Sequence, residues 1–476
     1  MSIYNIDLST YEQTFKVDTD DKLEYGEIYT PFKLIDKMLD LFDPAIFSDP
    51  TKRWLDAGAG KGYFSMRLFG RLNIGLSLVM PNEDERKTHI IKHMLYMVEI
   101  KDSNIIALKE LFGEENPNII HFDYCMLKSS QILEIDAFDV IIGNPPYNSK
   151  GIKKVPTNKT ILKKNDGITL WHNFLTTSLS LLKPITGKLC MIIPSIWLKP
   201  DKAGMHKLLT SYKLEKIHCY TSNETNTIFK GEAQTPTCFF LLTNQKRDAS
   251  MGGGGSIITL FDKTTSSYVN YYHMLGTPIP TFGQTITKKL QKWVEMVGYI
   301  KVLKTNMPSS KSKFVETPYD ANYPFINIKT CVLNKTSRRP QLMINYSNIK
   351  QAFHGEKKIV MAHKMYGFPY YDKEGHFGIS NRDSYVITGK TNEEFEQLQA
   401  FLTSKFALFM FETTRYRMKY LEKYAFQLIP DITRIVDFPK ENNINDTTIA
   451  EFFELDKRDC ETIQKLHKKD YVVFIP

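Results

Sequence analysis

Short apolar runs alternate with helical stretches between residues 53 and 245. This alternation is typical of an α/β domain with a mostly parallel sheet, in which the strands are buried on both faces. A helix is expected at 168–184, "ITLWHNFLTTSLSLLKP". The expected strands are the start of "RWLDAGAG" (53–60), "MLYMVEI" (94–100), "NIIHFD" (118–123), "FDVIIG" (138–143), "GKLCMIIP" (187–194) and "CFFLLTN" (238–244).

The pattern changes after residue 245. Four glycines, Gly252–Gly255, precede Ser256 and favour a flexible linker. No Gly-Lys-Ser/Thr follows them, so the run is not a phosphate-binding P-loop. Beyond residue 300 the chain is aromatic and basic, with helical signals at 391–412 and 447–468. The expected organisation is an N-terminal extension at 1–24, an α/β domain at 25–245, a linker and connecting segment at 246–299 and an α+β domain at 300–476.

The chain is basic, with a formal net charge of +9 and a pI of about 8.9. Residues 301–390 alone carry roughly that whole excess. A charge asymmetry of this kind favours a polyanionic partner, such as nucleic acid, for the C-terminal domain. The alternative is a basic face that is simply solvated.

Membrane proteins, secreted proteins and zinc proteins are disfavoured. The chain has no apolar run long enough to span a bilayer, and it begins without the basic start and apolar run of a secretory signal. The cysteines are scattered, without a Cys-x-x-Cys pair, which favours reduced thiols and argues against a zinc site. We therefore expect no membrane association, no metal, and a location in the cytoplasm or a cytosol-like compartment of a prokaryotic or viral system. The cysteines are Cys125, Cys190, Cys219, Cys238, Cys331 and Cys460.

A glycine-rich segment follows the first expected strand. "WLDAGAGKGYFS" (54–65) places Asp56 at the strand end, with Gly58, Gly60 and Gly62 ahead of a helix. Glycines let the backbone approach a ligand closely, and the start of a helix offers free N–H groups. The spacing is that of a nucleotide-type fold but not the dehydrogenase Gly-x-Gly-x-x-Gly fingerprint. The alternative is a tight turn without a ligand.

Acidic residues also end the next two expected strands. Glu99 closes the second strand, where a carboxylate can accept hydrogen bonds from ribose hydroxyls. Asp123 closes the third strand, where it can accept a hydrogen bond from an adenine amino group. For each residue the alternative is a surface carboxylate at a strand end.

The fourth expected strand runs directly into Asn144-Pro145-Pro146-Tyr147. Each proline lacks an N–H and fixes φ, so the strand ends in a stiff loop that presents Asn144 and Tyr147. The exocyclic amine of a base is a poor nucleophile because its lone pair is delocalised into the ring. The Asn144 side-chain oxygen and the Pro145 carbonyl can accept both amine hydrogens and expose the lone pair, and Tyr147 can stack on the base. The alternative is a plain proline turn.

The order of these pieces resembles the gamma group of N6-adenine DNA methyltransferases over residues 25–245. "GEIYTPFKLIDKML" (26–39) looks like the leading Thr-Pro segment of that family, which helps hold the methionine part of S-adenosylmethionine. The resemblance implies a Rossmann-like α/β methyltransferase fold, with a seven-stranded, mostly parallel sheet whose last strand is antiparallel. It maps the cofactor positions onto Tyr29, Thr30, Pro31, Asp56, Gly58, Gly60, Glu99, Asp123 and Tyr124, and the catalytic positions onto Asn144, Pro145, Pro146 and Tyr147.

Later segments carry a looser resemblance. "TIFKGEAQTPTCFFLL" (227–242) is similar to the family segment whose phenylalanine packs on the flipped base, which maps Phe229; the alternative for Phe229 is a core position. "GHFGISNRDSYVITG" (375–389) and "RYRMKYLEKYAFQLIPDI" (415–432) look like the recognition domains of type IIG fused enzymes. This implies a DNA target-recognition domain at 300–476. The first 25 residues are too few for a fused nuclease, so any restriction endonuclease is expected to be separately encoded.

Basic residues close to these segments are the candidates for DNA contacts. The lysine-rich loop at 148–166 follows the tetrapeptide and can hold phosphates that flank the target base, or it can be a solvated loop. Arginines mixed with aromatic residues can read guanine edges or bind phosphates. The candidates are Lys150, Lys153, Lys154, Lys163, Lys164, Arg338, Arg339, Arg415 and Arg417.

Together these features predict a site-specific DNA adenine-N6 methyltransferase. We expect it to flip an adenine out of double-stranded DNA and to transfer the methyl group of S-adenosylmethionine directly to N6. The tetrapeptide also occurs in families that methylate RNA bases, such as guanine N2, or the glutamine amide of release factors, because all these targets are planar amines or amides. The Thr-Pro segment and the long basic C-terminal domain favour DNA. The non-enzyme alternative is a catalytically dead DNA-binding module.

Overall fold

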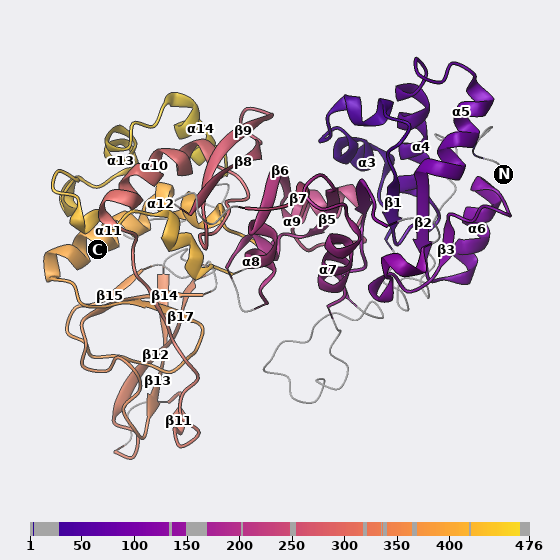
Figure 1. Cartoon of the computed structure of the whole chain (residues 1–476). Coiled ribbons are helices and arrows are strands. Elements are labelled where there is room, and N and C mark those ends of the chain that lie inside the picture. The colour runs from indigo at the N-terminus through magenta and orange to yellow at the C-terminus, as the bar shows by residue number, and fades with distance from the viewer. Residues whose placement is uncertain are drawn as a thin grey trace. The chain divides into compact units, whose positions relative to one another are not determined.

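The computed structural model describes residues 3, 28–132, 136–148, 169–200, 203–247, 254–317, 321–334, 336, 340–363, 369–417 and 420–466. The chain divides into two compact units. Figure 1 colours the chain by residue number, from indigo at the N-terminus to yellow at the C-terminus. Unit 1 comprises Met1–Trp197, Asp201–Phe261 and His273–Leu275. Unit 2 comprises Leu198–Pro200, Asp262–Tyr272 and Gly276–Pro476.

A single large sheet organises unit 1, with the strand order β3-β2-β1-β4-β5-β7-β6-β8-β9. Strands β1 to β5 pair in parallel, and β7 is antiparallel to both β5 and β6. The strands are β1 (Trp54–Ala57), β2 (Leu95–Glu99), β3 (Ile119–His121), β4 (Val140–Gly143), β5 (Lys188–Pro194), β6 (Tyr212–Tyr220), β7 (Thr237–Lys246), β8 (Gly255–Asp262) and β9 (Ser267–Met274).

The seven-stranded arrangement with an antiparallel last strand is confirmed in β1 to β7, and β8 and β9 extend the sheet beyond it. Strand β6 was not among the expected strands, because Lys213, Glu215 and Lys216 interrupt its apolar run. Strands β8 and β9 and helix α10 (Gln284–Val297) lie inside the segment 246–299 that we expected to connect the domains. Residues 248–253 of that segment lie outside the described residues.

Helices cover the sheet and complete the core of unit 1. Alternate strand residues such as Trp54, Met97 and Ile142 join one apolar cluster with residues of α3, α4 and α6. Because the parallel strands are buried on both faces, they read as nearly continuous apolar runs. The helices of unit 1 are α3 (Phe32–Leu39), α4 (Tyr63–Gly75), α5 (Glu83–His89), α6 (Asp102–Phe112), α7 (Trp171–Leu181), α8 (Met205–Thr210) and α9 (Ser222–Ile228).

Parallel pairing places the carboxyl ends of β1, β2, β3 and β4 at one edge of the sheet. The neighbouring order β3-β2-β1-β4 brings together the segments that follow these strands, although Gly58 after β1 and Asn144 after β4 are far apart in the chain. In open α/β sheets ligands bind at this edge, beside the strand where the order reverses. Here that strand is β1, which lies between β2 and β4.

Unit 2 combines two small sheets with five helices in its described part, an α+β arrangement. The sheets have the orders β10-β17-β14-β15 and β11-β13-β12-β16. The helical signals at 391–412 and 447–468 are confirmed as two helix pairs, and Ser404 separates the first pair by capping α12 through a hydrogen bond from the Ala407 N–H. None of the helices in the described part of the chain is long and apolar enough to cross a membrane.

The elements of unit 2 are β10 (Leu303–Lys304), β11 (Phe314–Val315), β12 (Phe325–Leu333), β13 (Pro340–Ser347), β14 (Lys358–Ala362), β15 (Tyr370–Asp372), β16 (Gly378–Ile379), β17 (Ser384–Ile387), α10, α11 (Asn392–Thr403), α12 (Lys405–Glu412), α13 (Asp446–Phe452) and α14 (Lys457–Leu466). Its core includes many phenylalanines, such as Phe395, Phe401 and Phe406.

Candidate active site

The glycine-rich loop connects β1 to α4. Gly58, Gly60 and Gly62 have φ of 72°, 55° and 85°, a left-handed conformation that side chains other than glycine rarely adopt. A Cβ on Gly62 would also lie 3.0 Å from the Leu108 side chain. The loop therefore requires glycine for both its conformation and its packing, and Gly62 forms the N-cap of α4.

Asp56 lies fully buried at the end of β1. Its Oδ2 accepts hydrogen bonds from the N–H (3.1 Å) and the hydroxyl (2.7 Å) of Ser65 on α4. Its Oδ1 is buried and finds no hydrogen-bond partner among the described residues. Burial raises the pKa of the Asp56 carboxyl to about 7, against the lowering effect of Ser65.

The raised pKa of Asp56 predicts a pH dependence of stability. The pKa is about 7 in the folded chain and 3.8 in the reference state, so between these values the folded chain holds a proton that the unfolded chain releases. The contribution of Asp56 to stability is therefore complete below about pH 4 and lost as the pH rises to about 7. Denaturation of unit 1, followed by tryptophan fluorescence, should show Asp56→Asn gaining stability over the wild type across this range. If the stabilities of the wild type and of Asp56→Asn changed in parallel with pH, the raised pKa of Asp56 would be contradicted.

Glu99 lies at the end of β2 and is 7% exposed. Its Oε2 accepts a hydrogen bond from the Gly60 N–H at 2.7 Å, and its Oε1 accepts from the N–H groups of Ile100 and Lys101, each at 2.9 Å. The carboxylate thus fixes the glycine-rich loop to the end of β2. Contact of Glu99 with a ribose stays a prediction, and the loop contact adds a second reason for Glu99 to affect a ligand at this edge.

Removal of the Glu99 carboxylate is expected to weaken S-adenosylmethionine binding. Glu99→Ala should raise the dissociation constant by a few-fold to ~100-fold, the loss of one or two charge-assisted hydrogen bonds together with a looser Gly60 backbone. Isothermal titration calorimetry with S-adenosylmethionine measures this. The matched control is Glu110→Ala, on the exposed side of α6, which should bind as the wild type does. Equal affinities of all three proteins would place the ribose-binding acid elsewhere.

The side chain of Asn144 meets the Thr-Pro segment. Its Nδ2 donates a hydrogen bond to the Thr30 hydroxyl at 3.1 Å, and Thr30 is 3% exposed. The Asn144 Oδ1 is buried and has no hydrogen-bond partner in the described part of the chain. Thr30 therefore holds the amide in one orientation, with its oxygen available to accept a hydrogen bond.

The rest of the tetrapeptide forms a partly buried loop. Pro145 is buried, and Pro146 and Tyr147 are half-buried. The Tyr147 carbonyl accepts a hydrogen bond from the Leu170 N–H at 3.2 Å, which ties the loop to the start of α7. Burial raises the pKa of the Tyr147 hydroxyl above its ordinary value, so the ring stays neutral.

The Thr-Pro segment also contacts the glycine-rich loop. The Tyr29 ring stacks on Tyr63, the first residue of α4, with centroids 5.1 Å apart and an angle of 7°. The Lys61 ammonium lies 5.4 Å from the centroid of the Tyr29 ring. Pro31 precedes α3 as its N-cap. The segments around residues 30, 60 and 144 therefore meet at one edge of the sheet.

Asp123 and Tyr124, the two candidates expected at the end of the third strand, lie beyond it. Strand β3 ends at His121, and Asp123 is exposed and caps a short 3-10 helix by accepting a hydrogen bond from the Cys125 N–H at 2.9 Å. Tyr124 is 2% exposed, and its hydroxyl lies 2.8 Å from the Ser178 hydroxyl. Its ring stacks on Phe174 of α7 at 4.8 Å. Tyr124 is thus a core residue behind the site, and its contact with adenine stays a prediction.

Phe174 is a residue that the sequence reasoning missed. Its ring would lie 3.3 Å from a Cβ placed on Gly58, so it packs between the glycine-rich loop and Tyr124. No local signal separates it from the other apolar residues of its helix. Its role follows only from the packing of α7 against the end of the sheet.

The structure favours the core alternative for Phe229. The side chain is 3% exposed and belongs to the main apolar cluster of unit 1. Its backbone N–H donates to the Thr225 carbonyl at 3.0 Å, at the end of α9. A ring packed in this way is not available to stack on a base in this conformation.

Of the candidate DNA-contact residues, only Arg415 and Arg417 lie in the described part of the chain. In unit 2, half-buried Arg415 forms an ion pair with Glu412 at 2.9 Å, and exposed Arg417 lies 3.6 Å from the Glu422 carboxylate. Arg417 is therefore the more accessible of the two. The remaining candidates, Lys150, Lys153, Lys154, Lys163, Lys164, Arg338 and Arg339, lie outside the described residues.

Two comparisons of sequence find similar proteins. Residues 71–227 match the model of the Eco57I restriction-modification methylase family. The chain is 31% identical over 96 residues to an uncharacterised adenine-specific methylase of Mycoplasma pneumoniae, a match that covers 19% of this chain and 23% of the relative. The matched family segment contains β2 to β6, including Glu99 and the tetrapeptide.

Comparison of structures supports the fold over most of the chain. The type IIL restriction-modification enzyme MmeI, solved in complex with DNA, aligns with 89% of this chain and 70% of its own, at a TM-score of 0.50 and 12% identity. The M protein of the type I restriction enzyme EcoKI aligns at a TM-score of 0.35 and 14% identity, over 54% of this chain and 51% of its own. The chain thus spans less than a quarter of the matched methylase and about half of the EcoKI subunit. The predicted class of fold, a Rossmann-like methyltransferase sheet with a further domain, is confirmed.

Proposed function

We propose that this chain is a site-specific DNA adenine-N6 methyltransferase that uses S-adenosylmethionine. The observation that carries the proposal is the hydrogen bond from Asn144 to buried Thr30, beside the glycine-rich loop. It joins the catalytic tetrapeptide to the Thr-Pro segment and leaves the Asn144 oxygen as an acceptor without a partner among the described residues. The match of residues 71–227 to a restriction-modification methylase family supports the same activity.

The residues at the edge of the sheet fit S-adenosylmethionine. Positive φ at Gly58 and Gly60 leaves the backbone open to close approach, and Glu99 holds this loop in place. Asp56 offers a buried Oδ1 without a partner in the described chain, suited to a hydrogen-bond donor or a cationic group. When bound, S-adenosylmethionine supplies an electrophilic methyl group. We infer that Tyr29, Thr30 and Pro31 hold its methionine end, and that Asp123 and Tyr124 lie toward its adenine end.

The tetrapeptide prepares the target amine as a nucleophile. Asn144 Oδ1 and the Pro145 carbonyl would accept the two N6 hydrogens, which localises the nitrogen lone pair. Thr30 fixes the Asn144 amide beforehand, so little reorganisation is needed at the moment of reaction. The neutral, half-buried Tyr147 would stack on the flipped base. Positioning and hydrogen bonding, rather than a covalent intermediate, account for catalysis.

Unit 2 is the proposed target-recognition domain. The basic excess of residues 301–390 suits the phosphate backbone of double-stranded DNA, and Arg417 is an exposed cation in this unit. Within the proposal, residues 25–245 provide catalysis and residues 300–476 provide recognition.

The rival substrates are an RNA base, such as guanine N2, and a protein glutamine amide. The tetrapeptide suits all of them because each offers a planar amine or amide. The similarity to an adenine-specific methylase and the basic unit 2 favour DNA adenine. A catalytically dead binding module is disfavoured because the Asn144 oxygen, the glycine-rich loop and Glu99 are all in place.

Methylation-sensitive long-read sequencing tests the proposal in cells. DNA from a methylation-deficient host that expresses the chain should carry N6-methyladenine at one short sequence. The same host expressing Asn144→Ala should lack this mark. Absence of any sequence-specific adenine mark in the wild-type culture would reject the proposed function.

A further inference from the structure

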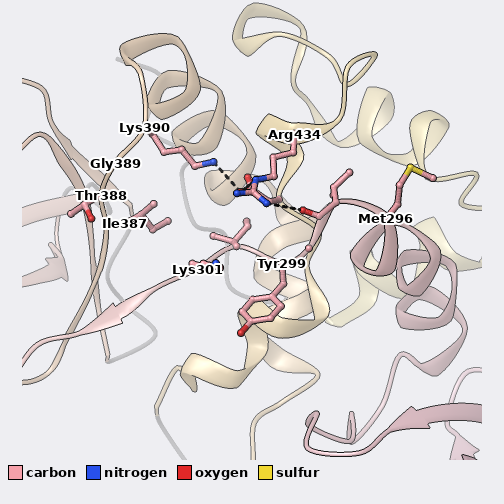
Figure 2. Close-up of a pocket in the computed structure, with 12 residues that line it drawn as sticks. Met296, Tyr299, Lys301, Ile387, Thr388, Gly389, Lys390 and Arg434 are labelled. Atoms are coloured by element: carbon pink, nitrogen blue, oxygen red, sulfur yellow. Dashed lines mark hydrogen bonds and ion pairs between the residues drawn. The ribbon is translucent and has the colours of Figure 1, made fainter. Parts of the chain in front are cut away.

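A pocket of about 500 Å³ lies within unit 2. Three segments line it: Met296–Lys301 after α10, Ile387–Lys390 between β17 and α11, and Asp431 with Arg434. Figure 2 shows Lys390 and Arg434 pointing toward one another across it. The second and third segments include the ends of 375–389 and 415–432, the two stretches that resemble recognition domains. The volume is that of an ordinary small-molecule site.

The charges of the pocket are unbalanced. Three of its lining residues are basic (Lys301, Lys390 and Arg434), and Asp431 is the one acidic residue among them. The Lys390 ammonium lies 2.9 Å from Asp431 Oδ2 and 3.6 Å from the carboxylate of Glu394. Asp431 also accepts a hydrogen bond from the Thr433 hydroxyl at 2.7 Å. The charge of Asp431 is therefore balanced mainly by Lys390, with a longer ion pair to Arg434.

Arg434 and Lys301 keep their hydrogen-bonding capacity. The Arg434 side chain is 60% exposed, its Nε lies 3.5 Å from Asp431 Oδ2, and its Nη1 lies 3.5 Å from the Val297 carbonyl. Both contacts are long, so most of the five guanidinium donors remain open to a ligand. Lys301 is exposed and forms no ion pair with the described residues. Two cations with open donors at one concave site suit a polyoxygen anion such as phosphate.

We propose that this pocket binds a phosphate group, held by Arg434 and Lys301. The guanidinium supplies a planar pair of donors to two phosphate oxygens, and the ammonium supplies a point charge to a third. Lys390 and Asp431 position Arg434 and are not themselves ligands. The phosphate belongs either to the backbone of bound DNA or to a free nucleotide. If the phosphate belongs to DNA, the site deepens the proposed role of unit 2 and rests on it; a site for a free nucleotide does not.

Pyrophosphate binding to the full chain tests the site itself. Calorimetric titration should show saturable binding to the wild type, weakened roughly tenfold or more in Arg434→Gln and in Lys301→Gln by the loss of charged hydrogen bonds. The matched control is Lys288→Gln, which removes the same charge from an exposed position of α10 outside the pocket. All three side chains are exposed, so their variants should unfold at the wild-type temperature.

The salt dependence of duplex DNA binding distinguishes the two sources. If the phosphate belongs to DNA, each pocket variant should lower the slope of log affinity against log salt by ~1. An unchanged slope together with lost pyrophosphate binding assigns the pocket to a free phosphate ligand. If both pocket variants match Lys288→Gln in both assays, the proposal is overturned. Neither assay requires methyl transfer, so failure of the proposed function would leave this result intact.

Discussion

Asn144→Ala is expected to lower the rate of methyl transfer by ~10²–10³-fold or more, the cost of removing an acceptor aimed at the reacting group. The Asn144 Oδ1 is the buried acceptor that the Thr30 hydroxyl orients, and alanine removes it entirely. S-adenosylmethionine binding should persist, because the glycine-rich loop is held by Glu99 and not by Asn144. Transfer of labelled methyl groups to DNA and calorimetric cofactor binding should be measured on the same preparation.

The control for Asn144→Ala is Asn173→Ala, which deletes the same amide from the exposed side of α7. It should keep wild-type activity. Near-normal methyl transfer by Asn144→Ala would reject the catalytic assignment. Loss of cofactor binding in parallel with activity would instead indicate a structural role for the Asn144–Thr30 hydrogen bond.

Gly143→Ala is expected to lower the rate of methyl transfer nearly as much as Asn144→Ala does, although the added group is a single methyl. A Cβ at this position would lie 2.7 Å from the carbonyl oxygen of Ala57, a backbone atom of the neighbouring strand β1. No side-chain rotation can relieve this contact, so β4 must move away from β1, at a cost of ~1–3 kcal/mol. The movement displaces Asn144, the next residue, and a shift of ~1 Å in a reacting group can cost ~10²-fold in rate.

Gly70→Ala is the matched control for Gly143→Ala. Gly70 lies inside α4, and a Cβ there would meet no atom within 4 Å. Alanine is the better helix former, so this variant should be as stable as the wild type or more stable. Thermal denaturation and steady-state kinetics should separate the two variants. Equal stability and activity of both would show that β4 does not depend on its close approach to β1.

The positions of the central strands of unit 1 could be predicted from the sequence because these strands are buried on both faces. Such strands read as apolar runs whatever their neighbours, which is why β1, β2, β4 and β5 lie where expected. Strand β6 was missed because Lys213, Glu215 and Lys216 interrupt its apolar residues; Glu215 lies at a register shift and forms an ion pair with Lys188. Strands β8 and β9 were missed because the glycine run before them is typical of a linker.

The residue types of the site were predictable, but their contacts were not. The spacing of the glycines and the stiff proline loop are local features that sequence displays. The hydrogen bond between Thr30 and Asn144 joins residues 114 positions apart, and only tertiary packing brings the segment before α3 to the end of β4. Glu99 was expected to face a ribose, yet it also binds the Gly60 backbone, a contact that depends on the parallel register of β1 and β2. Phe174 enters the site through tertiary packing alone.

Identification of the methylated product tests the central claim most directly. The purified chain, S-adenosylmethionine with a labelled methyl group and unmethylated duplex DNA should be incubated together, with ribosomal RNA and a release factor in parallel reactions. Mass spectrometry of the digested products should find the label on N6 of deoxyadenosine and in neither parallel reaction. Label on guanine N2 of the RNA or on a glutamine amide, with none in the DNA, would contradict the account.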